Sequence, residues 1–240
     1  MAIASLRPGA TFVLGHDHWM PSSSAILETR AQTSGGMVVV LNGFPGTGKL
    51  TILKQLQALL PPYRTRLLDN HLLIDPAQAL IPDRSDAHHG LRQRIRASCF
   101  GTATELAQQG YIILLTACLA EDNGGRDTEV LQEHLDIVRG TDVPLYWVNA
   151  HCSLEELGKR VGSPERRHGS KTKLTDMAIL NKIVSENSLI APREGGDGTI
   201  IVGTLDASGP VGDSVTLLMK LVGMAGSIEA ISSDGSASNS

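Results

Sequence analysis

A glycine-rich segment with a single lysine follows a short apolar run in the first third of the chain. It reads Gly43-Phe44-Pro45-Gly46-Thr47-Gly48-Lys49-Leu50-Thr51. Glycines let the backbone form a ring whose N–H groups point inward and bind phosphate oxygens. Lys49 would reach the β- and γ-phosphates of a nucleotide, and a following helix would add its positive N-terminus. The spacing matches the Walker A pattern; the alternative is an ordinary glycine-rich turn with a surface lysine.

This segment departs from the Walker A pattern at the position that normally binds Mg²⁺. The pattern has Ser or Thr directly after the lysine, and here Leu50 offers no oxygen. Thr51, one place later, lies on a different face of the helix and can bond an α-phosphate oxygen. A later apolar run ends at Thr116, where many phosphate-loop enzymes have a carboxylate. Two alternatives follow: Mg²⁺ is held by water and another carboxylate, or metal-dependent chemistry is weakened. The sequence therefore assigns no metal ligand. The predicted nucleotide-binding residues are Gly43, Gly46, Thr47, Gly48, Lys49, Leu50 and Thr51.

The elements that must position this segment alternate along the chain. Continuous apolar runs predict buried parallel strands at 37–41, 66–68, 111–117, 144–150 and 199–205. Helical periodicity lies between them, at 52–60, 91–110, 130–140, 154–161, 177–184 and 211–222. Five alternations predict a three-layer α/β domain with a five-stranded parallel sheet, whose ligands bind at the carboxyl ends of the strands.

The predicted domain covers residues 36–225. Residues 1–35 and 226–240 lack sustained apolar periodicity and are expected to be disordered or extended.

The sequence resembles a small P-loop kinase of the chloramphenicol phosphotransferase-like group, whose members are often described as AAA-domain proteins. The resemblance covers about residues 37–222. It rests on Val38-Val39-Val40-Leu41-Asn42-Gly43, Leu68-Asp69-Asn70-His71-Leu72, Leu145-Tyr146-Trp147-Val148 with Cys152 and Leu154-Glu155-Glu156, and the stretch 160–173. The first segment is specific for nucleotide binding, and the others identify a family better than a substrate. The resemblance implies a sheet with the phosphate-loop strand at its centre.

Asp69 is the first candidate catalytic group, because it ends the second predicted strand beside the nucleotide. In kinases that this chain resembles, an aspartate here faces the acceptor hydroxyl. Its carboxylate can take the hydroxyl's proton or hold Mg²⁺ through water. The alternative is a residue that caps a turn. His71 is a weaker candidate, since a packed or surface histidine is as good an interpretation.

A basic, glycine-containing stretch follows the predicted helix 154–161. Arg160 and Arg167 are its best candidates for a closing lid that brings guanidinium groups onto the transferred phosphate. The alternative is a solvated basic loop. The loop 206–210 is expected near the adenine or at the start of the last helix. His88 and His89 lack partners at metal-ligand spacing and are expected at the surface.

Composition sets the limits of the functional prediction. The 240 residues carry a net charge of −4 and only 3% aromatics, so nucleic acid is not an expected partner. No apolar run approaches the roughly 20 residues of a membrane span. Three unpaired cysteines and the absence of a signal predict a cytoplasmic protein. The oligomeric state is left open.

The sequence therefore predicts an ATP- and Mg²⁺-dependent phosphotransferase acting on a hydroxyl of a small molecule. The alternatives are a nucleotide-binding regulatory protein with little catalysis and a simple ATPase. The acceptor is not assigned.

Overall fold

The structure is a computed structural model that describes residues 35–122, 125–161, 176–193 and 199–224. Apart from residue 35, the predicted terminal segments 1–35 and 226–240 lie outside these ranges. Most of the stretch 160–173, including Arg167, also lies outside them. Among the helices of these ranges, none is long and apolar enough to cross a membrane.

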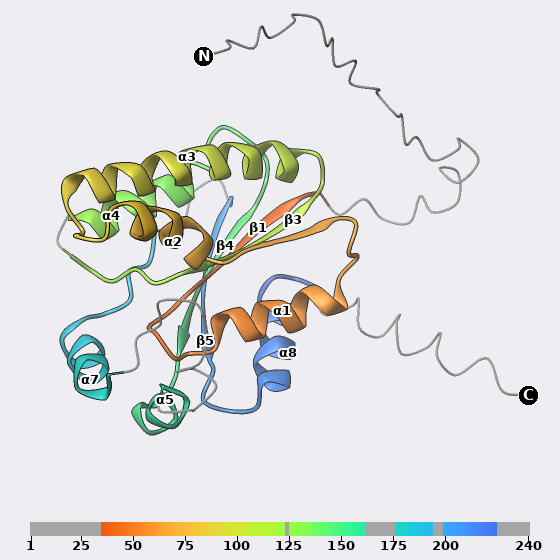
Figure 1. Ribbon diagram of the computed structural model, residues 1–240. Helices are drawn as coiled ribbons and strands as arrows, with labels where there is room; N and C mark the ends of the chain where they lie inside the picture. Colours follow the sequence, from red (N-terminus) through yellow and green to blue (C-terminus); the bar gives the residue numbers. More distant parts are fainter. Residues whose placement is uncertain (1–34, 123–124, 162–175, 194–198, 225–240) are drawn as a thin grey trace, which may run out of the picture. The chain divides into compact units, whose positions relative to one another are not determined.

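A five-stranded parallel sheet forms the middle layer (Figure 1). Its strands are β1 (Met37–Asn42), β2 (Thr65–Leu68), β3 (Ile112–Ala117), β4 (Leu145–His151) and β5 (Ile200–Asp206), in the spatial order β2-β3-β1-β4-β5. β1 pairs with β3 on one side and with β4 on the other, so Val39 lies opposite both Leu114 and Tyr146. The fold class and the central position of the phosphate-loop strand are as predicted.

Helices cover both faces of this sheet (Figure 1). One face carries α1 (Lys49–Leu59) and α8 (Val211–Leu221), and the other carries α2 (His71–Leu80), α3 (Asp86–Gln108) and α4 (Arg126–Leu135). Successive side chains of a strand point to opposite faces. Val39 and Leu41 accordingly pack with the α1 and α8 side, while Val38 and Val40 pack with the α3 and α4 side. Burial on both faces explains why β1 is apolar from its first residue to Leu41.

Two short helices, α5 (Leu154–Val161) and α7 (Met177–Glu186), form a separate small cluster. Leu157, Val161 and Leu180 are its fully buried members. In Figure 1 both helices lie at the edge of the sheet toward which the β4 arrow points. They therefore flank the end where the ligands of a parallel sheet bind.

Three helices differ from the sequence-based expectation, and one of them, α4, covers Arg126–Leu135 rather than 130–140. α2 was not predicted, because ten residues with an internal Pro76 give little helical signal. α3 begins at Asp86 rather than near Leu91, since the Ser85 hydroxyl accepts a hydrogen bond from the His88 N–H at 3.5 Å. The extra turn buries His88, which is 1% exposed, with Nδ1 2.7 Å from Ile81 O. The prediction that His88 lies at the surface was therefore wrong.

Candidate functional site

The glycine-rich segment connects the carboxyl end of β1 to the first turn of α1. Gly46 and Gly48 have φ values of 95° and 85°, in the left-handed region that favours glycine. Gly43 approaches the neighbouring strand so closely that a Cβ atom there would lie 2.8 Å from Ala150 O. Its own N–H bonds Ala117 O at 3.2 Å. These positions therefore need glycine for the loop to turn back over the sheet.

Lys49 lies across this loop. Its Nζ donates to Gly43 O at 2.6 Å, to Phe44 O at 2.9 Å and to the Thr47 hydroxyl at 3.3 Å. The ammonium group is thereby held at the mouth of the loop, next to the N-terminus of α1. Phosphate oxygens bound here would meet the lysine charge and the N–H groups of the first helical turn together.

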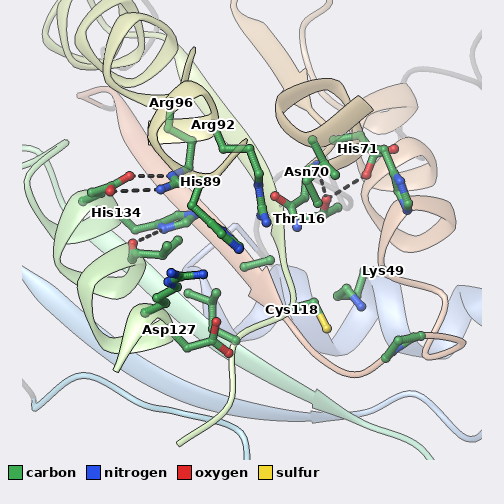
Figure 2. A pocket seen from close by; sticks show the side chains of 18 of the residues that line it. Lys49, Asn70, His71, His89, Arg92, Arg96, Thr116, Cys118, Asp127 and His134 are labelled. Atoms are coloured by element: carbon green, nitrogen blue, oxygen red, sulfur yellow. Dashed lines mark hydrogen bonds and ion pairs between the residues drawn. The ribbon is translucent and has the colours of Figure 1, made fainter. Parts of the chain in front are cut away.

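Asp69 lies directly after β2, is 7% exposed and is joined to β3 through a threonine hydroxyl. Thr116 Oγ donates to Asp69 Oδ1 at 2.9 Å and accepts the N–H of Asn70 at 2.8 Å. The hydroxyl of Thr116 thus ties the ends of two adjacent strands and fixes the orientation of the carboxylate. Lys49, Asp69 and Thr116 line one pocket, and Figure 2 shows the side chains of Lys49 and Thr116 at its border.

The residues near the loop offer few ligands for a metal. Leu50 and Thr51 both line the pocket, and only Thr51 carries an oxygen. Within the described ranges, no group of three or more His, Cys, Asp or Glu side chains is arranged to hold a metal ion. Mg²⁺ in phosphoryl-transfer sites often keeps several waters and relies on one or two carboxylates plus phosphate oxygens. Asp69 could hold Mg²⁺ in this way, through water, whereas the described residues offer no cage made of protein ligands alone.

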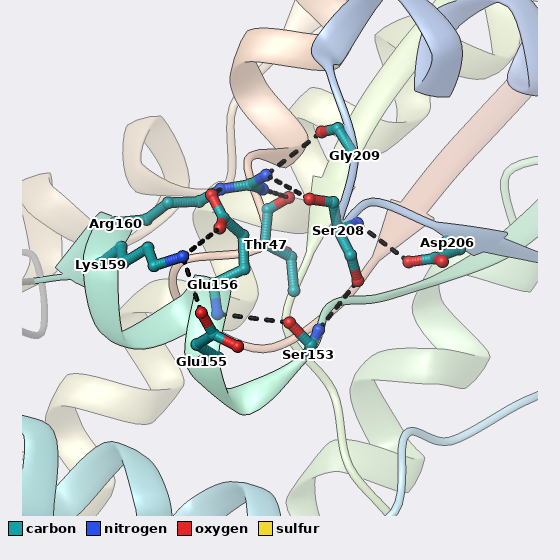
Figure 3. Close-up of polar contacts among 9 residues, drawn as sticks. All are labelled: Thr47, Ser153, Glu155, Glu156, Lys159, Arg160, Asp206, Ser208 and Gly209. Atoms are coloured by element: carbon teal, nitrogen blue, oxygen red, sulfur yellow. Dashed lines mark hydrogen bonds and ion pairs between the residues drawn. The ribbon is translucent and has the colours of Figure 1, made fainter.

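Arg160 does not line this pocket but lies on the outer side of the loop (Figure 3). Its guanidinium donates to Thr47 O at 3.3 Å and to Ser208 O and Gly209 O at 3.4 Å each. Glu156 accepts from its Nε at 3.2 Å. Arg160 therefore joins α5, the phosphate loop and the turn after β5, and its expected role on the transferred phosphate stays a prediction.

The turn after β5 was expected near the adenine or at the start of the last helix. Ser208 N–H bonds the carboxylate of Asp206 at 2.9 Å, and the Ser208 hydroxyl accepts the N–H of Ser153 at 3.0 Å. α8 begins at Val211, directly after Pro210. The turn thus leads into α8, and it borders the phosphate loop through Arg160.

A buried polar network lies beneath the loop, and sequence reasoning missed it. Asn42, the last residue of β1, donates to Leu119 O and to Asn149 Oδ1 at 3.0 Å each, and its Oδ1 accepts Leu119 N–H at 2.8 Å. Trp147 Nε1 and Asn149 Nδ2 both donate to Ile190 O, at 3.1 and 3.2 Å. The network fixes the segments after β3 and before β5 against the strand that carries the loop. In the sequence, the only indication of this network was the polar Asn42 at the end of an apolar strand, next to the glycines.

The pocket extends beyond the loop into the space between α3 and α4, with a volume of about 950 Å³. Sequence reasoning did not place this part in the site. Its charged and polar lining includes Arg84, Asp86, His89, Arg92, Arg96, Arg126, Asp127, Glu133 and His134. Figure 2 shows Arg92 and His89 extending from α3 toward its centre. Arg92 and Arg96 are four residues apart on one helix, so they share a face; that spacing was the available signal.

The surroundings shift the pKa values of His134 and Asp127 in this part of the pocket. The pKa of His134 is lowered to about 4, mainly by burial and also by the nearby Arg96 guanidinium, against the opposing effects of the hydrogen bond to Val130 O and of Glu133. Burial raises the pKa of Asp127, although its carboxylate accepts the N–H of Ala120 at 2.9 Å. Both shifts favour the uncharged form of the side chain, as burial does for any ionisable group.

The turn at Glu121 and Asp122 comes shortly before α4. The Asp122 carboxylate accepts the N–H groups of Gly125 and Asp127 at 3.0 and 2.6 Å, and the Thr128 hydroxyl at 2.7 Å. These bonds satisfy donors in the first turn of α4. Asp122 therefore stabilises the start of α4.

Comparison with known proteins identifies the fold. A sugar kinase from Janibacter matches with a TM-score of 0.52 and 15% identity, over 79% of this chain and 96% of that one. The thymidylate kinase of Candida albicans matches with a TM-score of 0.51 and 20% identity, over 80% and 93%.

The chain has a P-loop kinase-like fold. No protein-family model matches it, and no curated protein has a significant match to it. The similarity therefore lies in the tertiary structure.

Proposed function

We propose that this chain is a kinase that uses ATP to phosphorylate a hydroxyl group of a small molecule. One observation carries the proposal: the phosphate loop with Lys49 and the buried Asp69 line the same pocket, which continues between α3 and α4. A nucleotide on the loop would direct its terminal phosphate into this space. The volume of the whole pocket, about 950 Å³, is of the size that small-molecule sites have. The sugar kinase and the thymidylate kinase that share this fold support phosphoryl transfer as the reaction class, and the sugar kinase supports a hydroxyl acceptor.

In this proposal Lys49 and the loop N–H groups bind the phosphates and offset the negative charge that develops during transfer. The bond from the γ-phosphorus to the bridging oxygen breaks, and a new bond forms to the acceptor oxygen. Asp69 accepts the proton that this hydroxyl loses. Thr116 orients the Asp69 carboxylate through the 2.9 Å hydrogen bond. Mg²⁺ would supply further charge neutralisation, and holding it through water is the alternative role of Asp69.

The second candidate is a nucleotide-binding protein with little catalysis. Leu50 in the usual metal-ligand position favours it, and so does Thr116 where many phosphate-loop enzymes have a carboxylate. ATP binding without turnover on any acceptor would support this candidate. Turnover that needs no acceptor would instead indicate an ATPase.

Asp69→Asn tests the mechanism, because it removes the charge and the proton acceptor and leaves the side chain's size unchanged. ADP formation is measured with ATP, Mg²⁺ and a panel of hydroxylated small molecules. We expect ATP affinity to be retained and the rate to fall by roughly 10²–10⁴-fold, the usual contribution of general acid–base catalysis. Asp142→Asn, at an exposed position before β4, is the matched control and should keep the wild-type rate. A wild-type rate in folded Asp69→Asn would remove Asp69 from the site.

A further inference from the structure

The guanidinium group of Arg92 lies in the part of the pocket between α3 and α4, away from the phosphate loop. Arg92 extends from α3 into the pocket (Figure 2). Its Nε atom is buried and has no hydrogen-bond partner among the described residues. Buried donors are almost always paired, and those of a charged group most of all. Arg92 therefore lacks an acceptor that a bound molecule can supply.

The neighbouring acids do not fill this role, because other groups engage them. Glu133 forms a two-pronged pair with Arg96, with N···O distances of 2.5 and 3.0 Å. Asp86 pairs with Arg126 at 2.6 Å in an exposed contact. The Asp127 carboxylate accepts the N–H of Ala120. No ion pair within 4.0 Å joins any of these carboxylates to Arg92 in this part of the chain.

The surroundings of Arg92 disfavour a positive charge. Burial lowers its pKa, and the guanidinium groups of Arg96 and Arg84 lower it further, against the opposing effect of the Asp127 and Glu133 carboxylates. Arg84 also lines the pocket, from a residue with a φ of 53° in the turn before α3. Arginine stays protonated under such conditions, so the charge has to be offset by something other than proton loss. An anion bound in the pocket would offset it.

We propose that the acceptor molecule carries an oxyanion, a carboxylate or a phosphoryl group, which Arg92 binds between α3 and α4. The planar guanidinium fork matches both oxyanions. The inference rests on the proposed function, since it places the anion in the acceptor part of the kinase pocket. Arg92 and Asp69 line the same pocket, so one small molecule can place its anion at Arg92 and its hydroxyl at Asp69.

The test is isothermal titration calorimetry with inorganic phosphate as the probe. The protein is first saturated with AMP-PNP and Mg²⁺, so that the phosphate loop is filled. We expect phosphate to bind once per chain, and Arg92→Gln to weaken this binding on the order of 10- to 100-fold, as for a hydrogen bond to a charged group. Arg94→Gln, an exposed arginine of the same helix, is the matched control and should bind phosphate as the wild type does.

Two further measurements keep the outcome unambiguous. Arg92→Gln should bind AMP-PNP normally and should melt no lower than the wild type, because it removes a half-buried charged side chain whose Nε has no acceptor. A lower melting temperature would show a structural role and overturn the inference. Equal phosphate affinity in Arg92→Gln and the wild type, or no phosphate binding by the AMP-PNP complex, would also overturn it. Failure to bind AMP-PNP would instead refute the nucleotide site itself.

Discussion

His134, in the last turn of α4, should make the stability of this protein fall in mildly acidic solution. The side chain is 4% exposed and lies against the rings of Phe100 and Trp147, with centroid distances of 4.7 and 5.7 Å. Its Nδ1–H donates to Val130 O at 2.7 Å. Protonation in the folded state would place a charge among apolar rings, next to Arg96.

The direction and size of the effect follow from the pKa values. The pKa of His134 is about 4 in the folded protein and 6.5 in an unperturbed chain, so the unfolded state binds the proton first as the pH falls. The His134 contribution is complete above pH 6.5 and is lost between pH 6.5 and 4. Its total is about 3 kcal/mol at roughly 1.4 kcal/mol per pKa unit, of which about 2 kcal/mol is lost by pH 5.

The assay is urea denaturation at pH 7.5 and pH 5.0 for the wild type and for His134→Leu. Leucine does not titrate, so every other acid-sensitive group contributes equally to both proteins. We expect the free energy of unfolding to fall by about 2 kcal/mol more in the wild type than in His134→Leu. The exposed His151→Gln should behave as the wild type. The same pH dependence in wild type and His134→Leu would refute the reasoning.

Two further predictions concern the phosphate loop. Lys49→Ala should weaken ATP binding by on the order of 10- to 100-fold, the value of a hydrogen bond to a charged group. Lys54→Ala, at an exposed position, is the control and should bind ATP as the wild type does. Equal ATP affinities of Lys49→Ala and the wild type by calorimetry would contradict the nucleotide site. Gly46→Ala and Gly48→Ala both force a left-handed alanine, at about 1–2 kcal/mol each. Only a Cβ at Gly46 would also contact the buried Val161, at 2.9 Å, so the melting temperature should fall further in Gly46→Ala than in Gly48→Ala. Equal decreases in the two variants would contradict this prediction.

Several elements could be predicted from the sequence because their signals are local. Met37 to Leu41 is continuously apolar, as a strand covered on both faces requires, and the structure places β1 there. The alternation of strands with helices predicted a parallel sheet with crossover connections. In such a sheet the carboxyl ends of β1 and β2 lie at the same edge. Lys49 and Asp69 were placed together on that reasoning, and they line one pocket.

Other features depended on contacts between distant segments. In the sequence, Arg92 and Arg96 belong to the polar side of an amphipathic helix, and nothing local distinguishes a solvent-facing side from one that faces α4. Arg160 was expected to reach toward the phosphate, yet the turn after β5, about 48 residues later, offers it carbonyl acceptors. The position of His134 against Trp147 also depends on how α4 packs on the sheet.

The sequence by itself determined the strand that carries the phosphate loop, the glycines that shape that loop and the lysine that follows them. Each depends on the conformational freedom or burial of residues that are neighbours in the chain. Only the tertiary structure decided which charges face the pocket and which of them have partners. An arginine's partner is chosen by where other segments pack, as the pair of Arg96 with Glu133 shows, and the unpaired Nε of Arg92 follows from the same packing.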